Sequence, residues 1–162
     1  MKKLLIFLLL AAMVFSFASC KENNDESQQT AKTYTFTSGT TKIAIDADAA
    51  PILASLGEWR DYAESTSCAF EGLDKVYIYA GFELQTYPMG EKDYVYMIIL
   101  QDDTVATEKG IRIGANMEAV IEAYGTPNLQ MENLLMYKGS GMYLQFILRD
   151  GVVTSIQYSK AQ

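Results

Sequence analysis

Gly110–Pro127, GIRIGANMEAVIEAYGTP, contains a complete set of local signals for a strand followed by a short helix. Residues 111–113 alternate between isoleucine and arginine, which is the period of a half-buried strand. Asn116 stands where an N-cap side chain accepts a hydrogen bond from the first helical turn. Gly125 and Pro127 then end the helix. The apolar residues of this predicted helix recur at helical spacing on one face: Met117, Val120, Ile121 and Tyr124.

The same pattern occurs earlier in the chain, from Ile43 to Gly57, without an insertion. Asp48 takes the N-cap position, and Gly57 takes the position that ends the helix. We therefore interpret the chain as two tandem copies, residues 33–104 and 107–158. The alternative is that two short capped helices resemble each other without a duplication.

Each copy also contains three segments with the alternation of half-buried strands. They are residues 76–79, 82–87 and 94–100 in the first copy, and 134–138, 142–148 and 152–158 in the second. Asp150-Gly151 is the strongest hairpin signal between these segments. We therefore predict an α+β fold in which two strand-helix-three-strand copies form an antiparallel sheet with short helices packed on one face.

The N-terminus has the layout of a secretory signal peptide, with a basic start at residues 1–3 and an apolar run over residues 4–17. This run is shorter than the roughly 20 residues of a membrane-spanning helix. Residues 17–20, Phe-Ala-Ser-Cys, resemble the lipobox of bacterial lipoproteins. The resemblance implies cleavage before Cys20 and a lipid on its thiol. Ordinary secretion and an uncleaved anchor are the alternatives.

These signals divide the chain into a signal peptide (residues 1–19), a flexible tether (residues 20–32) and one folded domain (residues 33–162). The tether has almost no apolar side chains, so it cannot bury enough surface to fold. We expect the mature protein to lie outside the cytoplasm, attached to a bacterial membrane through the lipid on Cys20.

The second copy resembles a family of small outer-membrane lipoprotein domains, called SmpA/OmlA-like or BamE-like, over residues 113–127 and 143–153. The tandem arrangement resembles the β-lactamase inhibitor protein (BLIP) family, in which two such copies form a concave binding sheet. The resemblance implies a non-enzymatic domain that acts through protein contacts. Two features depart from the BLIP pattern. Only Cys68 remains for a disulfide once Cys20 is lipidated, and nothing matches the enzyme-inserting loop of the inhibitors.

The sequence offers few groups for catalysis. It has no histidine, which removes the commonest general base and the commonest metal ligand. Cys68 has no base in its motif, so we expect a free thiol that is buried or half-buried. Asp46, Asp48 and the Asp102-Asp103 pair lack the spacing of a calcium loop and are expected in turns and caps. We therefore predict no enzyme activity, no metal site and no cofactor.

The chain is acidic, with 13 basic and 20 acidic residues and a formal net charge of −7. It has no basic patch, which argues against nucleic acid as a partner.

Alternation along the strands predicts the two faces of the sheet. The positions expected to face the helices are Val76, Ile78, Phe82, Leu84, Val95, Met97, Ile99, Met142, Leu144 and Phe146. The positions expected on the exposed face include six tyrosines: Tyr77, Tyr79, Tyr87, Tyr94, Tyr96 and Tyr143. A tyrosine-rich face favours protein binding, although tyrosine also suits exposed antiparallel strands by propensity. The interpretation requires that the tyrosines share one face.

The predicted function is a membrane-anchored, non-catalytic module that binds a protein of the cell envelope through this face. The alternatives are a structural envelope component without a discrete ligand, an inhibitor of a β-lactamase or another enzyme, and an enzyme whose acidic residues are not recognisable from sequence. Trp59 is expected to fill the core beneath the loop that leads to Cys68, or else to form an exposed contact.

Overall fold

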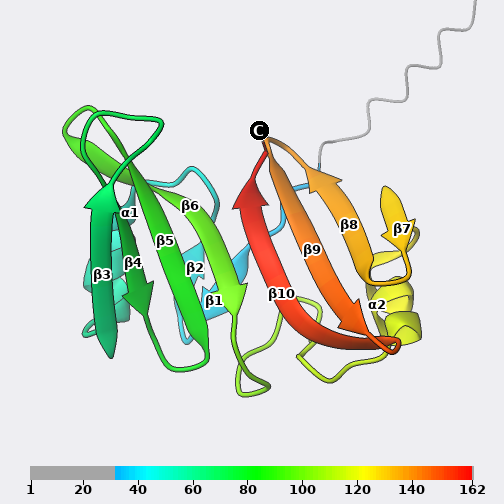
Figure 1. The fold of residues 1–162 in the computed structure, drawn as a ribbon. Coiled ribbons are helices and arrows are strands. Elements are labelled where there is room, and N and C mark those ends of the chain that lie inside the picture. Colours follow the sequence, from blue (N-terminus) through cyan, green and yellow to red (C-terminus); the bar gives the residue numbers. More distant parts are fainter. Residues whose placement is uncertain (1–31, 162) are drawn as a thin grey trace, which may run out of the picture.

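The computed structural model describes residues 32–161, and its main element is one antiparallel sheet of eight strands (Figure 1). The strands are β3 (Asp61–Thr66), β4 (Leu73–Ile78), β5 (Phe82–Met89), β6 (Lys92–Leu100), β7 (Leu129–Met131), β8 (Leu134–Gly139), β9 (Met142–Arg149) and β10 (Val152–Lys160). Their order across the sheet is β3-β4-β5-β6-β10-β9-β8-β7.

The α+β prediction is wrong, because the fold is mostly β, with 48% strand and 12% helix. The helices are α1 (Ala49–Leu56) and α2 (Met117–Tyr124), of eight residues each. Each helix is followed by four strands, where three were predicted. The outer strands β3 and β7 were missed because their residues are all exposed and so show no alternation of burial. Residues 111–113, predicted as a strand, form none.

The two halves of the sheet meet at their last strands. Within each half, neighbouring strands follow one another in the sequence and pair antiparallel. The halves join where residues 97–100 of β6 pair with residues 156–159 of β10. The first strand of each half therefore lies at an outer edge of the sheet, and the last strand lies at this seam.

The predicted helix caps are confirmed. Asp48 accepts a hydrogen bond from the Ala50 N–H at 3.1 Å, and Asn116 accepts one from the Ala119 N–H at 2.8 Å. Each helix ends at a glycine with positive φ, 76° at Gly57 and 80° at the equivalent position of α2. Local signals thus decide where both helices begin and end.

One core serves both halves. The helices and the small hairpin of β1 (Phe36–Ser38) and β2 (Thr41–Ile43) lie behind the large sheet in Figure 1. Phe36 is fully buried, and its ring centroid lies 4.9 Å from that of Phe82 and 6.2 Å from that of Tyr158. Because these contacts reach a strand of each half, the hairpin closes the core behind the seam.

Candidate binding face

The face of the eight-stranded sheet that lies away from α1, α2 and the β1–β2 hairpin is called the open face below. Residues directly opposite each other on paired strands point to the same side of a sheet. One row of such residues is buried throughout and therefore marks the core side: Tyr77, Leu84, Ile98, Tyr158, Leu144 and Tyr137.

The neighbouring rows, shifted by one residue, make up the open face. One of them crosses all eight strands: Asp61, Ile78, Glu83, Ile99, Gln157, Gln145, Met136 and Leu129. Another crosses seven strands: Ala63, Val76, Gln85, Met97, Ser159, Tyr143 and Lys138. Both halves therefore contribute to one continuous surface.

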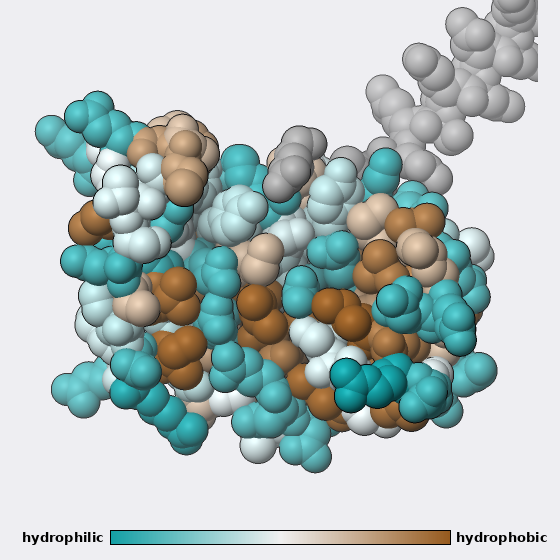
Figure 2. Space-filling view, viewed as in Figure 1, coloured by the Kyte–Doolittle hydropathy of each residue, from teal (hydrophilic) through white to brown (hydrophobic). Residues whose placement is uncertain are grey.

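The open face mixes apolar and amide side chains. Its half-buried apolar residues come from both halves: Val76, Ile78, Met97, Ile99, Leu134, Met136, Tyr143 and Ile147. Figure 2 shows hydrophobic patches over the strands of this side, separated by hydrophilic groups. Near the seam, Glu83 accepts hydrogen bonds from the Nε2 atoms of Gln85 at 2.5 Å and Gln101 at 3.2 Å. These contacts hold the amides in place, so the surface combines ordered polar groups with apolar area.

The prediction that the six tyrosines share one exposed face is wrong. Tyr77 and Tyr79 are buried on the core side, with 6% and 7% of their surface exposed, and burial raises the pKa of both phenols. The reason is the two-residue turn between β4 and β5, which places Tyr79 opposite Phe82 and Tyr77 opposite Leu84. If the residues of β5 face the core, their partners on β4 do so as well.

The same argument moves Val76 and Ile78 to the open face, contrary to expectation. In β6, a bulge changes which residues face the core. Thr86 pairs with Val95 and Gln85 with Met97, so the residue between the two partners is an extra one on β6. The bulge shifts the alternation by one position. The residues that it redirects are Met97 and Ile99, which reach the open face, and Ile98, which is buried in the core.

The remaining tyrosines gather at two places on the open side. Tyr87 is paired with Tyr94 and is only 3% exposed, because neighbouring aromatic rings pack around it. Tyr96 is the bulge residue, and its ring centroid lies 6.2 Å from that of Tyr87. Tyr143 is half-buried in the seven-strand row on β9.

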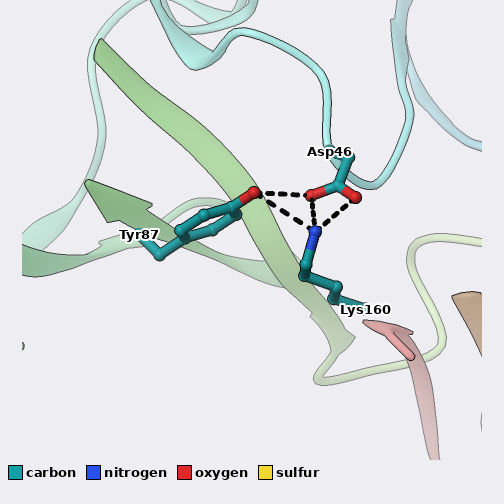
Figure 3. Close-up of polar contacts among 3 residues, drawn as sticks. All are labelled: Asp46, Tyr87 and Lys160. Atoms are coloured by element: carbon teal, nitrogen blue, oxygen red, sulfur yellow. Dashed lines mark hydrogen bonds and ion pairs between the residues drawn. The ribbon is translucent and has the colours of Figure 1, made fainter. Parts of the chain in front are cut away.

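Tyr87 also belongs to a polar cluster that joins the two halves (Figure 3). Its hydroxyl donates to Asp46 Oδ1 at 2.7 Å, and Lys160 Nζ lies 2.5 Å from both carboxylate oxygens of Asp46. Burial and the hydrogen bond to Asp46 raise the pKa of the Tyr87 phenol. The hydrogen bond to Asp46 raises the pKa of Lys160. The cluster therefore holds a charged lysine at the end of the last strand.

Asp46 reaches this position because its loop forms backbone hydrogen bonds with β6. The Asp46 N–H donates to the Val95 carbonyl at 2.9 Å, and the Val95 N–H donates to Ala47 at 3.0 Å. These backbone groups are free because β10 pairs with β6 only from residue 97 onward. Asp46 and Asp48 thus take the predicted places, Asp46 in a turn and Asp48 at the N-cap of α1. Asp46 also forms an ion pair across the seam.

A pocket of about 220 Å³ opens beside Tyr87, between the β3–β4 loop and strands β4, β5 and β6. Its lining includes Cys68, Phe70, Asp74, Lys75, Gln85, Tyr87 and Tyr96. Phe70 packs on Tyr87 with ring centroids 4.9 Å apart, which holds the loop over the sheet. Cys68 is exposed, so the expectation of a buried or half-buried thiol is wrong.

Trp59 does not fill the core, because 45% of its surface is exposed. Its ring lies against Tyr62 and Tyr77, with centroid distances of 5.9 Å and 5.1 Å, at the β3 edge of the sheet. A hydrogen bond to Glu64 raises the pKa of Tyr62 to about 12. These aromatic residues are packed against one another and lie outside the open face.

Within residues 32–161, no three acidic, cysteine or histidine side chains gather as metal ligands would. Asp102 accepts hydrogen bonds from the backbone and hydroxyl of Thr104, which lower its pKa and place it in a turn. The open face therefore offers chemistry for contact, through apolar area, amides and aromatic rings.

The predicted signal peptide (residues 1–19), the predicted lipidation site Cys20 and all but the last residue of the predicted tether (residues 20–32) lie outside the described residues. Among residues 32–161, neither helix has the length and apolar character needed to cross a membrane. The chain matches no family model, and no curated protein or solved structure matches it either.

Proposed function

We propose that this protein is a lipid-anchored, non-catalytic module that binds another protein of the bacterial cell envelope through the open face. The observation that carries the proposal is the row of residues that crosses all eight strands without a covering helix. On the four central strands its members are half-buried: Glu83, Ile99, Gln157 and Gln145. A surface that combines half-buried apolar side chains with amide groups has the mixed composition of non-obligate protein interfaces.

The location rests on the lipobox-like residues 17–20, which imply a lipid on Cys20. An anchored chain with its binding face on a separate folded domain would hold a partner close to the membrane. Two tandem copies, as the sequence suggests, agree with the matching order of helix and four strands in each half.

The test is affinity capture of envelope proteins on the full chain, purified in detergent. The double variant Ile99→Gln and Ile147→Gln removes apolar area from both halves of the open face. We expect it to weaken capture by about tenfold or more, because central apolar contacts carry most interface energy. Trp59→Gln is the matched control, because it removes an exposed aromatic side chain outside the open face and should leave capture unchanged.

A partner held equally by the native chain and the double variant would contradict the proposed face. No partner for the native chain would contradict a protein-binding function. Circular dichroism of each variant shows whether a lost partner reflects lost folding.

A further inference from the structure

The pocket beside Tyr87 has aromatic walls and one acidic group. Phe70 of the β3–β4 loop, Tyr87 of β5 and Tyr96 of β6 line it, together with Asp74 at the start of β4. Its volume of about 220 Å³ is far too small for a folded element and suits a single side chain. The pocket lies at one side of the open face, where a bound protein would reach it.

The aromatic rings can attract a positive charge. The Lys160 ammonium already lies 5.2 Å from the centroid of the Tyr87 ring, within the range of a cation–π contact. Its charge is matched by Asp46 at 2.5 Å, so it adds little repulsion toward a second cation. The faces of Phe70 and Tyr96 are not approached by any lysine or arginine among the described residues.

The acidic group in the pocket has no cationic partner. Asp74 takes part in none of the ion pairs or side-chain hydrogen bonds among residues 32–161. Lys75 also lines the pocket, but its ammonium is bound to Asp93 at 2.7 Å. The positive charges close to the pocket are therefore neutralised by other carboxylates, while the charge of Asp74 is not.

We propose that this pocket binds an arginine side chain of the partner protein, which makes a basic surface segment the recognised element. The inference rests on the proposed protein-binding function and names the chemistry of its partner. A guanidinium is planar and stacks on aromatic rings, while its N–H groups donate to a carboxylate such as Asp74. The excess of acidic over basic residues in the chain favours the same kind of partner.

The reactivity of the Cys68 thiol reports directly on binding in the pocket, because Cys68 lines the pocket and is exposed. The full chain with Cys20→Ser contains this thiol alone, and its reaction with an aromatic disulfide reagent can be followed by absorbance. The probes are the N-acetyl amides of arginine and of citrulline, which share their shape and differ in charge. We expect arginine amide to slow the reaction of Cys68 at millimolar concentration, and citrulline amide to be weaker by about tenfold.

Two variants test whether the protection of Cys68 arises from binding in this pocket. Asp74→Asn preserves shape and removes the charge, and Phe70→Ala removes one aromatic wall. Each should weaken protection by arginine amide by about fivefold to tenfold. Glu122→Gln on α2, distant in the fold, is the charge-matched control and should change nothing.

Equal protection by both amides would show an uncharged apolar pocket and overturn the proposal. Absence of protection by arginine amide, or protection that Asp74→Asn leaves unchanged, would overturn it as well. These probes need no partner protein, so the inference can fail while capture on the open face succeeds. Failed capture with intact arginine protection would contradict the proposed function instead.

Discussion

Tyr79 stacks on Phe82 across the two-residue turn between β4 and β5, with ring centroids 5.0 Å apart and ring planes 13° apart. The contact accompanies the burial of this side of β4, and the Tyr79 hydroxyl is buried there without a hydrogen-bond partner among residues 32–161. Tyr79→Phe should therefore keep or raise the free energy of unfolding, because an unsatisfied buried hydroxyl costs about 1–3 kcal/mol. Urea unfolding measures this change.

Substitution by serine separates the core tyrosines from those of the open face. Tyr79→Ser should lower the free energy of unfolding by about 3–5 kcal/mol, as expected when a buried ring is removed. Tyr94→Ser, at a half-buried position of the open face, should cost less than about 2 kcal/mol. Similar losses for both variants would contradict the assignment of faces.

Gly81 in the same turn should not tolerate a side chain. Its φ is 82°, and a Cβ there would lie 2.6 Å from Thr104 Oγ1 and 2.9 Å from Val105 Cγ1. Gly125 has almost the same φ, 80°, with no atom within 4 Å of an added Cβ. Gly125→Ala should cost about 1–2 kcal/mol from backbone strain alone. Gly81→Ala should cost roughly 1–3 kcal/mol more because of the clash. Equal thermal stabilities of the two variants would rule out the close contact.

Phe36 should couple the two halves of the sheet into one folding unit. Its ring touches Phe82 in the first half and Tyr158 in the second, and Phe36→Ala should cost about 3–5 kcal/mol. The fluorescence of Trp59, the single tryptophan, reports on the first half, and far-ultraviolet circular dichroism reports on the whole sheet. Both signals should report the same loss of stability and change together in a single unfolding transition. Separate transitions for the two signals would indicate two independent cores.

Local sequence signals predicted the parts of the fold that depend on neighbouring residues. Asn116 and Asp48 cap their helices as expected, since a cap needs only a side chain and the next few amides. The faces of the strands failed because they depend on pairing. Residue type suggested that Ile78 faces the core, whereas the pairing of β4 with β5 across the turn puts it on the open face.

The candidate site was predictable only in part for the same reason. Tyr94 and Tyr143 reach the open side as predicted, but the extra residue Tyr96 in β6 reverses the alternation beyond it. No residue type marks that bulge in the sequence, so Met97 and Ile99 were assigned to the core. The ion pair of Asp46 with Lys160 joins residues near the two ends of the domain. Spacing along the chain carries no sign of such a contact.

The ion pair between Asp48 and Lys92 should make stability depend on pH in acid. Hydrogen bonds from Lys92 and from the Ala50 N–H lower the pKa of Asp48 below its ordinary value of 3.8. A carboxyl group whose pKa is lower in the folded state stabilises the fold above its unfolded pKa. That contribution is lost as pH falls from about 3.8 through the lower folded value.

Asp48→Asn tests this dependence, because asparagine also caps helices and carries no titrating group. At about pH 6 the native chain should resist urea better than the variant, since only the native chain keeps the ion pair with Lys92. The difference in urea midpoint should shrink as pH falls below about 3.8 and the carboxylate is protonated. A difference that stays constant from about pH 6 to about pH 2.5 would mean that Asp48 acts through its cap alone. In that case the contact between Asp48 Oδ2 and Lys92 Nζ at 2.6 Å would contribute nothing measurable, as is common for exposed ion pairs.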